Sequence, residues 1–436
     1  MSVIYVIVTL LLIISFLNKK YLLFLLCYTA LMTDLFMLDS TGSIIRGSDL
    51  CFCVNAVLLP VALMRRRKEN TKNKIIDRFV KLFLFFTLFQ FFYTIYIGAD
   101  GVFNAFKVLR TPLMLLAFYS FSIVPIEIYK RFLKIMLWIT LFQGVLFLLQ
   151  FLGINFLAGR YDEDIFSFAF ALNVPTFIFF YIFYCLDTEY TRKTQYVWFF
   201  FFIVIILLTF VRGWIISVLL GLVLYVVMLR GLKKSKFLIL SLLLVVPIMV
   251  SVIETKTTVK DSQHSSINEI SNLFTGHENI KDAAMTGGTL TFRVAMLIER
   301  IDYLVQNPKY LFLGVGAIHE DSPNCYNRFD FKIGTNNEDK YYGRCLIDSG
   351  DITWVPIVLR YGMIGTIIYL CIPFLLIKLA RNRKDTLRIL FPIFVIYFFK
   401  SFNGALFETP LIYLELSIYL SLFVRSKVEN KELICS

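Results

Sequence analysis

Long apolar runs separated by short basic clusters extend over most of this sequence. A helix that crosses a membrane needs about 20 predominantly apolar residues. The runs that meet or approach this length are 2–17, 21–38, 50–64, 79–97, 111–124, 135–152, 167–186, 196–211, 213–229, 237–253, 352–377, 389–406 and 411–424. The pattern predicts an all-α polytopic membrane protein with about 13 transmembrane helices.

Composition agrees with this class. The 436 residues are 58% hydrophobic and 17% charged, whereas about a quarter of the residues in a soluble domain are charged. A net charge of +13 could suggest a nucleic-acid-binding protein, but the chain has too little polar surface for one. Composition therefore excludes a soluble enzyme and argues against nucleic acid as a partner.

The positions of the basic residues explain the net charge. Cytoplasmic loops of membrane proteins are enriched in Lys and Arg, and 27 of the 44 such residues fall on one side if the N-terminus is outside. These clusters are 19–20, 65–81, 130–134, 192–193, 230–236, 378–388 and 425–431. The first run lacks a preceding basic region, so we expect a retained span rather than a signal peptide.

Four regions follow from this topology. We predict a ten-span membrane region over 1–253, a large outer loop over 254–351, three C-terminal spans over 352–424 and a cytoplasmic tail over 425–436. Within the first region, 196–229 has a single charge, Arg212, and basic clusters at both ends. The chain must therefore return to the side it left, which predicts a short hairpin with Arg212 at its outer turn.

The outer loop contains one periodic segment. From Thr291 onward apolar residues recur at helical spacing until Pro308, which predicts an amphipathic helix with Arg293 and Arg300 on one face. Cys325 and Cys345 are the cysteines of this loop. A disulfide between them and two free thiols both remain open.

Arginines on the predicted outer face are the first candidates for chemistry. Arginine binds a diphosphate through two parallel hydrogen bonds and stays charged near a bilayer. Diphosphate is the leaving group of polyprenyl-linked glycans. The alternative for each is an interfacial side chain that reaches the lipid headgroups. The candidates are Arg110, Arg160, Arg212, Arg293, Arg300 and Arg360.

Carboxylates near these arginines are candidates for proton transfer. Asp348 and Asp351 immediately precede a span, where each could be a general base toward a sugar hydroxyl or an ordinary helix cap. His319 is a further possible base or an exposed loop residue. Charges inside spans are costly and often functional, so Lys400, Glu408 and Glu415 stand out, and we expect Lys400 and Glu408 to form a structural pair.

Motifs for nucleotide, dinucleotide or metal chemistry do not occur in the sequence: there is no Walker motif, HExxH or GxSxG. The cysteine spacing does not fit a zinc site either. The expectation is a chain that uses no cofactor and no metal.

Four short motifs resemble a known family. They are Val211-Arg212-Gly213-Trp214 in the hairpin, Arg293 with Asn307-Pro308 after its helix, Gly314-Val-Gly316, and Gly362-x-x-Gly365 in a later span. Over about 196–370 the arrangement resembles the O-antigen ligase and O-antigen polymerase superfamily. Ligases of this superfamily have His-Asn before the Gly-x-x-Gly span, where this chain has Asp351 and Ile352, so the resemblance favours the polymerase branch.

The resemblance implies a metal-independent glycosyltransferase of the bacterial inner membrane with a periplasmic loop. It would polymerise lipid-linked repeat units of O-antigen, capsule or another surface polysaccharide. The donor would be a polyprenyl-diphosphate-linked oligosaccharide, such as one on undecaprenyl diphosphate, and further partners would be membrane lipids and a chain-length regulator.

In this scheme each candidate residue has a role. Arg212, Arg293 and Arg300, with Arg360 and Arg110 in support, would hold the diphosphate, and Asp351 or Asp348 would take the proton. The alternatives are a ligase that transfers glycan to lipid A core, and a lipid-linked oligosaccharide flippase or other transporter. Transporters commonly contain two related halves, and the sequence has no convincing internal repeat.

Overall fold

The structure is a computed structural model of the whole chain. The residues that it describes are 3–33, 46–69, 71, 73–150, 177–187, 192–208, 212–230, 289–320, 322–329, 331, 333, 347, 352–381, 383, 386–402, 404 and 406–428.

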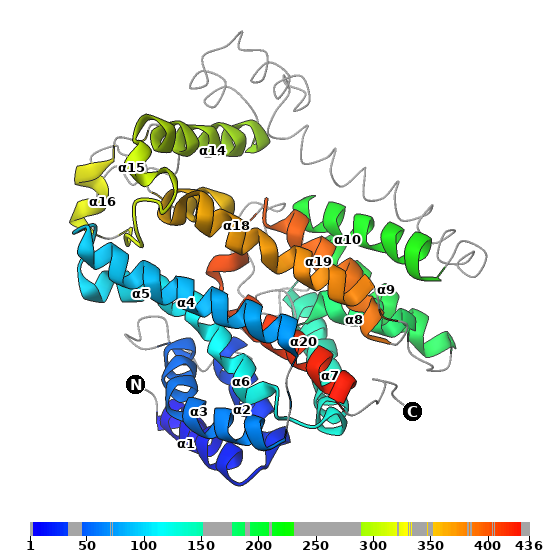
Figure 1. Cartoon of the computed structure of the whole chain (residues 1–436). Helices are drawn as coiled ribbons and strands as arrows, with labels where there is room; N and C mark the ends of the chain where they lie inside the picture. Colours follow the sequence, from blue (N-terminus) through cyan, green and yellow to red (C-terminus); the bar gives the residue numbers. More distant parts are fainter. Residues whose placement is uncertain are drawn as a thin grey trace.

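All regular elements in the described ranges are helices (Figure 1). The first group is α1 (Val3–Leu17), α2 (Tyr21–Thr33), α3 (Gly47–Lys68), α4 (Lys74–Tyr96), α5 (Val102–Leu113), η1 (Met114–Leu116), α6 (Ala117–Phe121) and α7 (Ile126–Gln150). The second is α8 (Ile178–Asp187), α9 (Arg192–Leu208), α10 (Arg212–Leu224) and the π-helix η2 (Tyr225–Arg230). The third is α14 (Thr289–Gln306), α15 (Pro308–Leu311), α16 (Pro323–Arg328), α18 (Trp354–Arg381), η4 (Thr386–Ile389), α19 (Leu390–Lys400), η5 (Leu406–Glu408) and α20 (Pro410–Val428).

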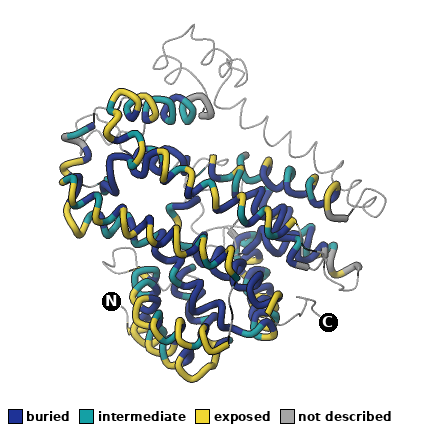
Figure 2. Tube along the Cα trace, viewed as in Figure 1, coloured by how far each residue is buried: buried dark blue, intermediate teal, exposed yellow. Residues whose placement is uncertain are grey.

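Five of the described helical stretches are long and apolar enough to cross a membrane, and four shorter apolar helices accompany them. Large apolar side chains stand exposed on the outside of the bundle, including Val3, Met64, Phe85 and Ile216, and Figure 2 shows such exposed stretches along α1, α3, α4 and α10. Water would make these surfaces costly, whereas lipid makes them favourable. The prediction of an all-α polytopic membrane protein is confirmed.

Two spans begin earlier than the hydropathy predicts. The run expected at 111–124 is the end of a longer stretch that starts with α5 at Val102, so Arg110 lies on a helix and not in a loop. Likewise α7 begins at Ile126 and includes the basic cluster of 130–134. Hydropathy marks only the apolar part of a helix, and these helices extend into polar surroundings.

At one end of the bundle the predicted cytoplasmic clusters come together. Buried Arg66 pairs with Asp77, and buried Arg425 pairs with Glu69 at 2.6 Å, which links α3 to α4 and to α20. Arg65 donates to carbonyl oxygens at the end of α1. These contacts join only segments that the charge pattern places on one side.

At the other end the outer loop is fastened to the turn after α4. The carboxylate of Asp100 accepts hydrogen bonds from the His319 backbone N–H (2.9 Å) and from the Ser322 hydroxyl (2.8 Å). It also accepts from the Asn104 amide at 3.0 Å. One buried acid therefore fixes the loop on α4 and α5.

The long helix α18 is broken at Gly362, whose φ of 61° and ψ of −162° are not helical. The backbone N–H groups of Val315 and Gly316 donate to the carbonyl oxygens of Leu359 and Arg360 at 3.0 and 3.1 Å. A Cβ at Gly362 would lie 2.5 Å from the backbone nitrogen of Gly314. The two glycine motifs of the sequence are therefore one structural unit, in which the loop satisfies the backbone groups that the break exposes.

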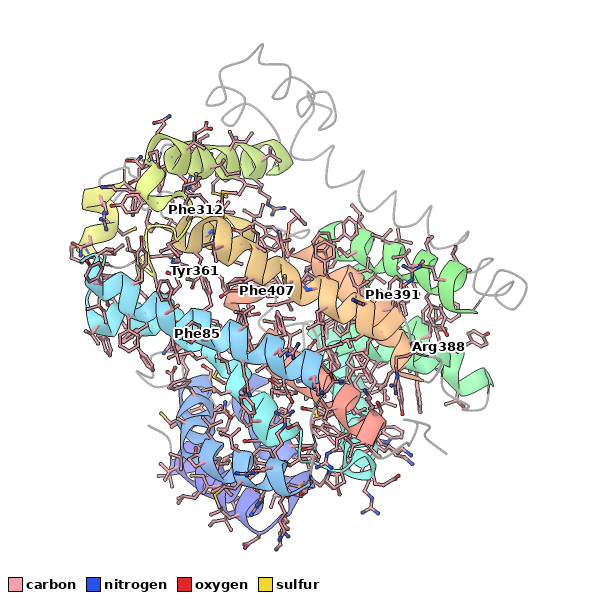
Figure 3. All side chains as sticks on the ribbon, viewed as in Figure 1. Phe85, Phe312, Tyr361, Arg388, Phe391 and Phe407 are labelled. Atoms are coloured by element: carbon pink, nitrogen blue, oxygen red, sulfur yellow. The ribbon has the colours of Figure 1, made fainter. Side chains whose placement is uncertain are left out.

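Aromatic side chains fill the space between the helices (Figure 3). The rings of Tyr361 and Tyr369 stack with centroids 5.5 Å apart, and Tyr369 meets Phe407 at 5.8 Å. These contacts pack η5 against α18, and so place the start of α20 beside the break.

Candidate functional site

The amphipathic helix predicted in the outer loop is α14, which packs on α18 (Figure 1). Ala295, Met296 and Leu304 form its buried face, and the turn after it leads through Asn307 into α15. The predicted helix and its end before Pro308 are confirmed.

The two arginines of α14 lie in different surroundings. Arg300 is fully buried, with its Nη1 2.6 Å from Glu299 Oε2 and 2.6 Å from the Ile333 carbonyl oxygen, and its guanidinium 4.2 Å from the centroid of the Phe331 ring. Arg293 is half-buried. Arg300 therefore binds other parts of the outer loop, and Arg293 is the more accessible of the two.

Arg360 is also buried and engaged. Its Nη1 lies 3.0 Å from Glu408 Oε1, its Nη2 lies 3.7 Å from Glu320 Oε1, and its Nε donates to the Ile318 carbonyl oxygen at 3.1 Å. This side chain joins α18 to the outer loop and to η5. The pair expected between Lys400 and Glu408 is wrong, because Glu408 pairs with Arg360.

Arg110, near the end of α5, contacts the start of α3. Its Nη1 is 2.5 Å from Asp49 Oδ1, and both side chains are partly exposed. The other oxygen of Asp49 accepts from the backbone N–H of Arg46 at 3.1 Å. Arg110 thus supports the segment that carries Arg46.

The predicted hairpin is divided where expected: α9 ends at Leu208, and α10 begins at Arg212. The side chain of Arg212 lies outside the described part of the structure. Trp214, two residues later, lines a cavity, so the first turn of α10 stands at this cavity.

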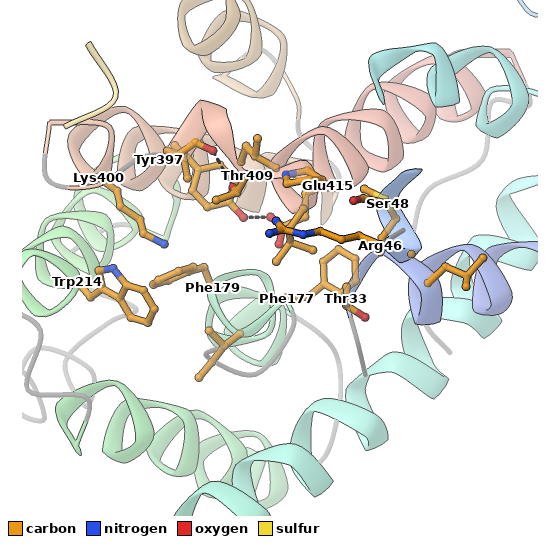
Figure 4. A pocket seen from close by; sticks show the side chains of 18 residues that line it. Thr33, Arg46, Ser48, Phe177, Phe179, Trp214, Tyr397, Lys400, Thr409 and Glu415 are labelled. Carbon is orange, nitrogen blue, oxygen red and sulfur yellow. Dashed lines mark hydrogen bonds between the residues drawn. The ribbon is translucent and has the colours of Figure 1, made fainter. Parts of the chain in front are cut away.

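The cavity has a volume of about 410 Å³ and lies between helix ends that are far apart in the sequence (Figure 4). Its walls come from the end of α2, the start of α3, the start of α8, the first turn of α10, the end of α19 and the segment from η5 into α20. Its size is in the range that holds small ligands.

Two cations face this cavity. The Lys400 ammonium lies 4.2 Å from the centroid of the Trp214 ring and 5.2 Å from that of Phe179. Arg46 extends into the cavity from the opposite wall (Figure 4). Among the described residues no carboxylate forms an ion pair with either cation, so both charges are available to an anionic ligand.

One carboxylate shares the cavity. Glu415, on α20, is 6% exposed and accepts hydrogen bonds from the hydroxyls of Tyr397 and Tyr419 on its Oε2, the latter at 3.4 Å. No described side chain donates to its Oε1. The wall of the cavity therefore holds an acid that is oriented through one oxygen.

The start of α18 is bound to the chain that follows Lys400. The Thr353 backbone N–H donates to the carbonyl oxygens of Ser401 and Gly404, each at 3.1 Å, and the Trp354 indole N–H donates to the Ser401 hydroxyl at 2.9 Å. Asp351 and Asp348, which precede this segment in the sequence, lie outside the described residues.

The remaining candidates from the sequence also fall partly inside and partly outside the described residues. His319 is described, and its backbone contacts Asp100, whereas Arg160 lies outside the described residues. Cys325 is a buried free thiol, and burial raises its pKa to about 11. Cys345, the other cysteine of the outer loop, is not among the described positions.

A metal centre finds no support in the described ranges, where His, Cys, Asp and Glu nowhere gather in a group of three or more that could hold an ion. The donors around the cavity are mainly cationic and aromatic. Such a lining suits an anion and not a metal ion.

The sequence alone did not predict the grouping of Arg46, Lys400 and Glu415. Arg46 is not among its candidates, and Lys400 is expected there to pair with Glu408. The usable signal is that Lys400 and Glu415 are charges within apolar spans, but only the packing of six helix ends brings them to one cavity.

Residues 197–370 match the family model of O-antigen ligase. No curated protein matches the sequence. The matched segment includes α10, α14, the loop with Gly314 and Gly316, and the break in α18, whereas Arg46, Lys400 and Glu415 lie outside it. Over this segment the chain is therefore similar to the O-antigen ligase and O-antigen polymerase superfamily, as its motifs predict.

Proposed function

We propose that this chain is a membrane glycosyltransferase that polymerises lipid-linked oligosaccharide repeat units for a bacterial surface polysaccharide. The donor is a glycan on a polyprenyl diphosphate, and the acceptor hydroxyl belongs to another lipid-linked repeat unit. In this proposal the cavity faces the periplasm, and the chain lies in the inner membrane with its large loop outside.

The observation that carries the proposal is the pair of cations at the cavity, next to the first turn of α10. Lys400 and Arg46 come from opposite walls and have no described acidic partner. The diphosphate gains negative charge as its bond to the sugar breaks, and fixed cations in a site with little water stabilise such charge most strongly. The N-terminus of α10, at Arg212, carries the partial positive charge of the helix dipole, which adds to the charge of the two cations.

The arginines predicted from the sequence have graded roles in this proposal. Arg212, at the first residue of α10, and half-buried Arg293 bind the diphosphate together with Lys400 and Arg46. Arg300, Arg360 and Arg110 already hold acids or carbonyl oxygens of the protein. They support the reaction by fixing the outer loop and the start of α3.

The polymerase is favoured over the ligase by Asp351 and Ile352, which stand where ligases of this superfamily have His-Asn. Asp351 and Asp348 remain the sequence's candidates for the proton acceptor. No metal or cofactor takes part in the proposed reaction, because the cations of the cavity provide the charge stabilisation.

The test is a reconstituted assay with purified full-length protein in lipid vesicles. Polyprenyl-diphosphate-linked repeat units are supplied on the outer face, with and without lipid A core as a second acceptor. Growth of a polymer on the carrier lipid supports the proposal, and transfer only to lipid A core shows a ligase instead. Movement of the donor across the bilayer without new glycosidic bonds shows a flippase and overturns the proposal.

The variant Arg212→Ala sharpens the assay. The expected result is a fall in polymer yield of about 100-fold, the size of effect typical for one removed charge-stabilising group, at a normal protein level. Unchanged yield and length would remove the role proposed for Arg212.

A further inference from the structure

We propose that Glu415 is the proton acceptor of the transferase, and that Tyr397 and Tyr419 orient it. This inference rests on the proposed function and names a catalytic residue that lies outside the segment matched by the family model.

Glu415 lines the cavity that also contains Lys400 and Arg46 (Figure 4). It lies on the second turn of α20, about 8 Å along the helix from Pro410 at 1.5 Å per residue. A sugar whose diphosphate is bound by the two cations would therefore share the cavity with this carboxylate.

Two tyrosines fix the orientation of the Glu415 carboxylate. Two tyrosine hydroxyls, one from α19 and one from the next turn of α20, donate to the same oxygen, Oε2. Both hydroxyls are buried with their rings. A carboxylate held through one oxygen keeps its rotamer, so Oε1 has a fixed direction and is left to accept a hydrogen bond from a bound group.

In glycosyl transfer, Oε1 of Glu415 can accept the proton of the attacking hydroxyl. The acceptor hydroxyl oxygen forms a bond to the anomeric carbon of the donor sugar. The bond between that carbon and the diphosphate oxygen breaks, and its electron pair leaves with the diphosphate. The hydroxyl proton moves to Oε1 of Glu415, so charge and atoms balance with no further reactant.

A structural role alone leaves part of this arrangement unexplained. A carboxylate that served only to tie α19 to α20 would need one tyrosine and would not need to face a cavity that holds two cations. Buried acids without an ionic partner are costly, and within the described ranges Glu415 has only tyrosine donors. The site is therefore typical of a group kept for function.

The experiment compares Glu415→Gln, Glu415→Asp and Glu415→Ala with wild type in the reconstituted assay. Glutamine keeps the shape and can accept from both tyrosines but cannot take the proton. The expected turnover of Glu415→Gln is at least about 100-fold lower, as for the loss of a general base. The affinity for the polyprenyl diphosphate carrier itself, measured by titration, is expected to stay within about threefold of wild type, which is about 0.7 kcal/mol at 1.4 kcal/mol for each factor of ten.

Chemical rescue separates catalysis from structure. Formate enters the space that Glu415→Ala leaves and can accept the proton, so its addition is expected to restore turnover at least tenfold, and Glu415→Asp is expected to keep an intermediate rate. Asp351→Asn is the parallel variant, because Asp351 is the rival acceptor from the sequence. Its turnover is expected to exceed that of Glu415→Gln.

The outcomes are distinct. If wild type forms no glycosidic bond from any tested donor, the proposed function fails. If wild type is active and Glu415→Gln keeps turnover within threefold, or formate gives Glu415→Ala no recovery, only the role of Glu415 is overturned. Loss of turnover in Asp351→Asn beside an active Glu415→Gln assigns the proton to Asp351 and likewise overturns it.

Discussion

Arg66 and Arg425, at the end of the bundle where the predicted cytoplasmic clusters gather, are buried against acids of neighbouring helices. Lys400 and Arg46, at the opposite end, face a cavity in which no described acid pairs with them. Both ends therefore place cations among apolar helices, but Arg66 and Arg425 are neutralised within the protein, whereas Lys400 and Arg46 face the cavity without a described acidic partner.

This contrast indicates which cations of a basic membrane protein are candidates for chemistry. A buried cation with an acid beside it is balanced by the fold, and removal of either partner leaves an uncompensated buried charge. A cation that faces a cavity and contacts only aromatic rings stays available to a ligand. Arg300 and Arg360 show that the outer end has cations of the first kind too, so side of the membrane alone does not identify a functional residue.

The largest effect on stability is expected for Arg66→Ala. Removal of one partner of a buried ion pair costs about 3–5 kcal/mol, and here the change leaves Asp77 without its pair and removes the contacts of the guanidinium with the Phe118 and Tyr119 rings. The melting temperature in detergent measures the effect, with Arg67→Ala, at an exposed position of the same helix, as control. Equal melting temperatures for the two variants would contradict the comparison.

A smaller loss of stability is expected for Arg360→Met at the outer end. The change leaves Glu408 and Glu320 without this cation, and loss of hydrogen bonds to charged groups costs about 2 kcal/mol. Because both acids are partly exposed, water replaces some of the contact. Limited proteolysis of the outer loop, beside the melting temperature, tests this prediction: a loop cleaved no faster than in wild type would show that Arg360 does not fasten it.

Lys400→Met should have the opposite profile, with unchanged melting temperature and about 100-fold lower turnover. The variant keeps an apolar stem against Trp214 and Phe179 but removes the charge proposed to stabilise the leaving diphosphate. Lys378→Met, an exposed change at the far end of α18, is the matched control. Destabilisation without loss of turnover would place Lys400 with the structural cations.

The smallest effect is expected for Arg110→Ala. Its pair with Asp49 is partly exposed, and such pairs contribute about 0–1 kcal/mol. We expect a small fall in melting temperature and a change in turnover below tenfold, through the position of Arg46. A loss as large as that of Lys400→Met would show that Arg110 itself binds the substrate.

Several parts of the site were predictable because a local pattern carries them. The apolar spacing after Thr291 and the stop at Pro308 determine α14, and the lone charge in 196–229 locates the break at Arg212. The glycines at 314, 316 and 362 stand in motifs that the sequence shows. The reason for glycine at these positions is a close contact between the loop and α18, which the sequence does not show.

Sequence alone was enough to predict the class of protein and the apolar part of most described helices, because hydropathy acts on each segment separately. Which cations are neutralised depends on tertiary packing: Arg300 and Arg360 have partners in or beside the outer loop, and Lys400 and Arg46 have no acidic partner among the described residues. The physical reason is that an ion pair depends on distances of a few ångströms between segments far apart in the chain, and no local pattern fixes those distances.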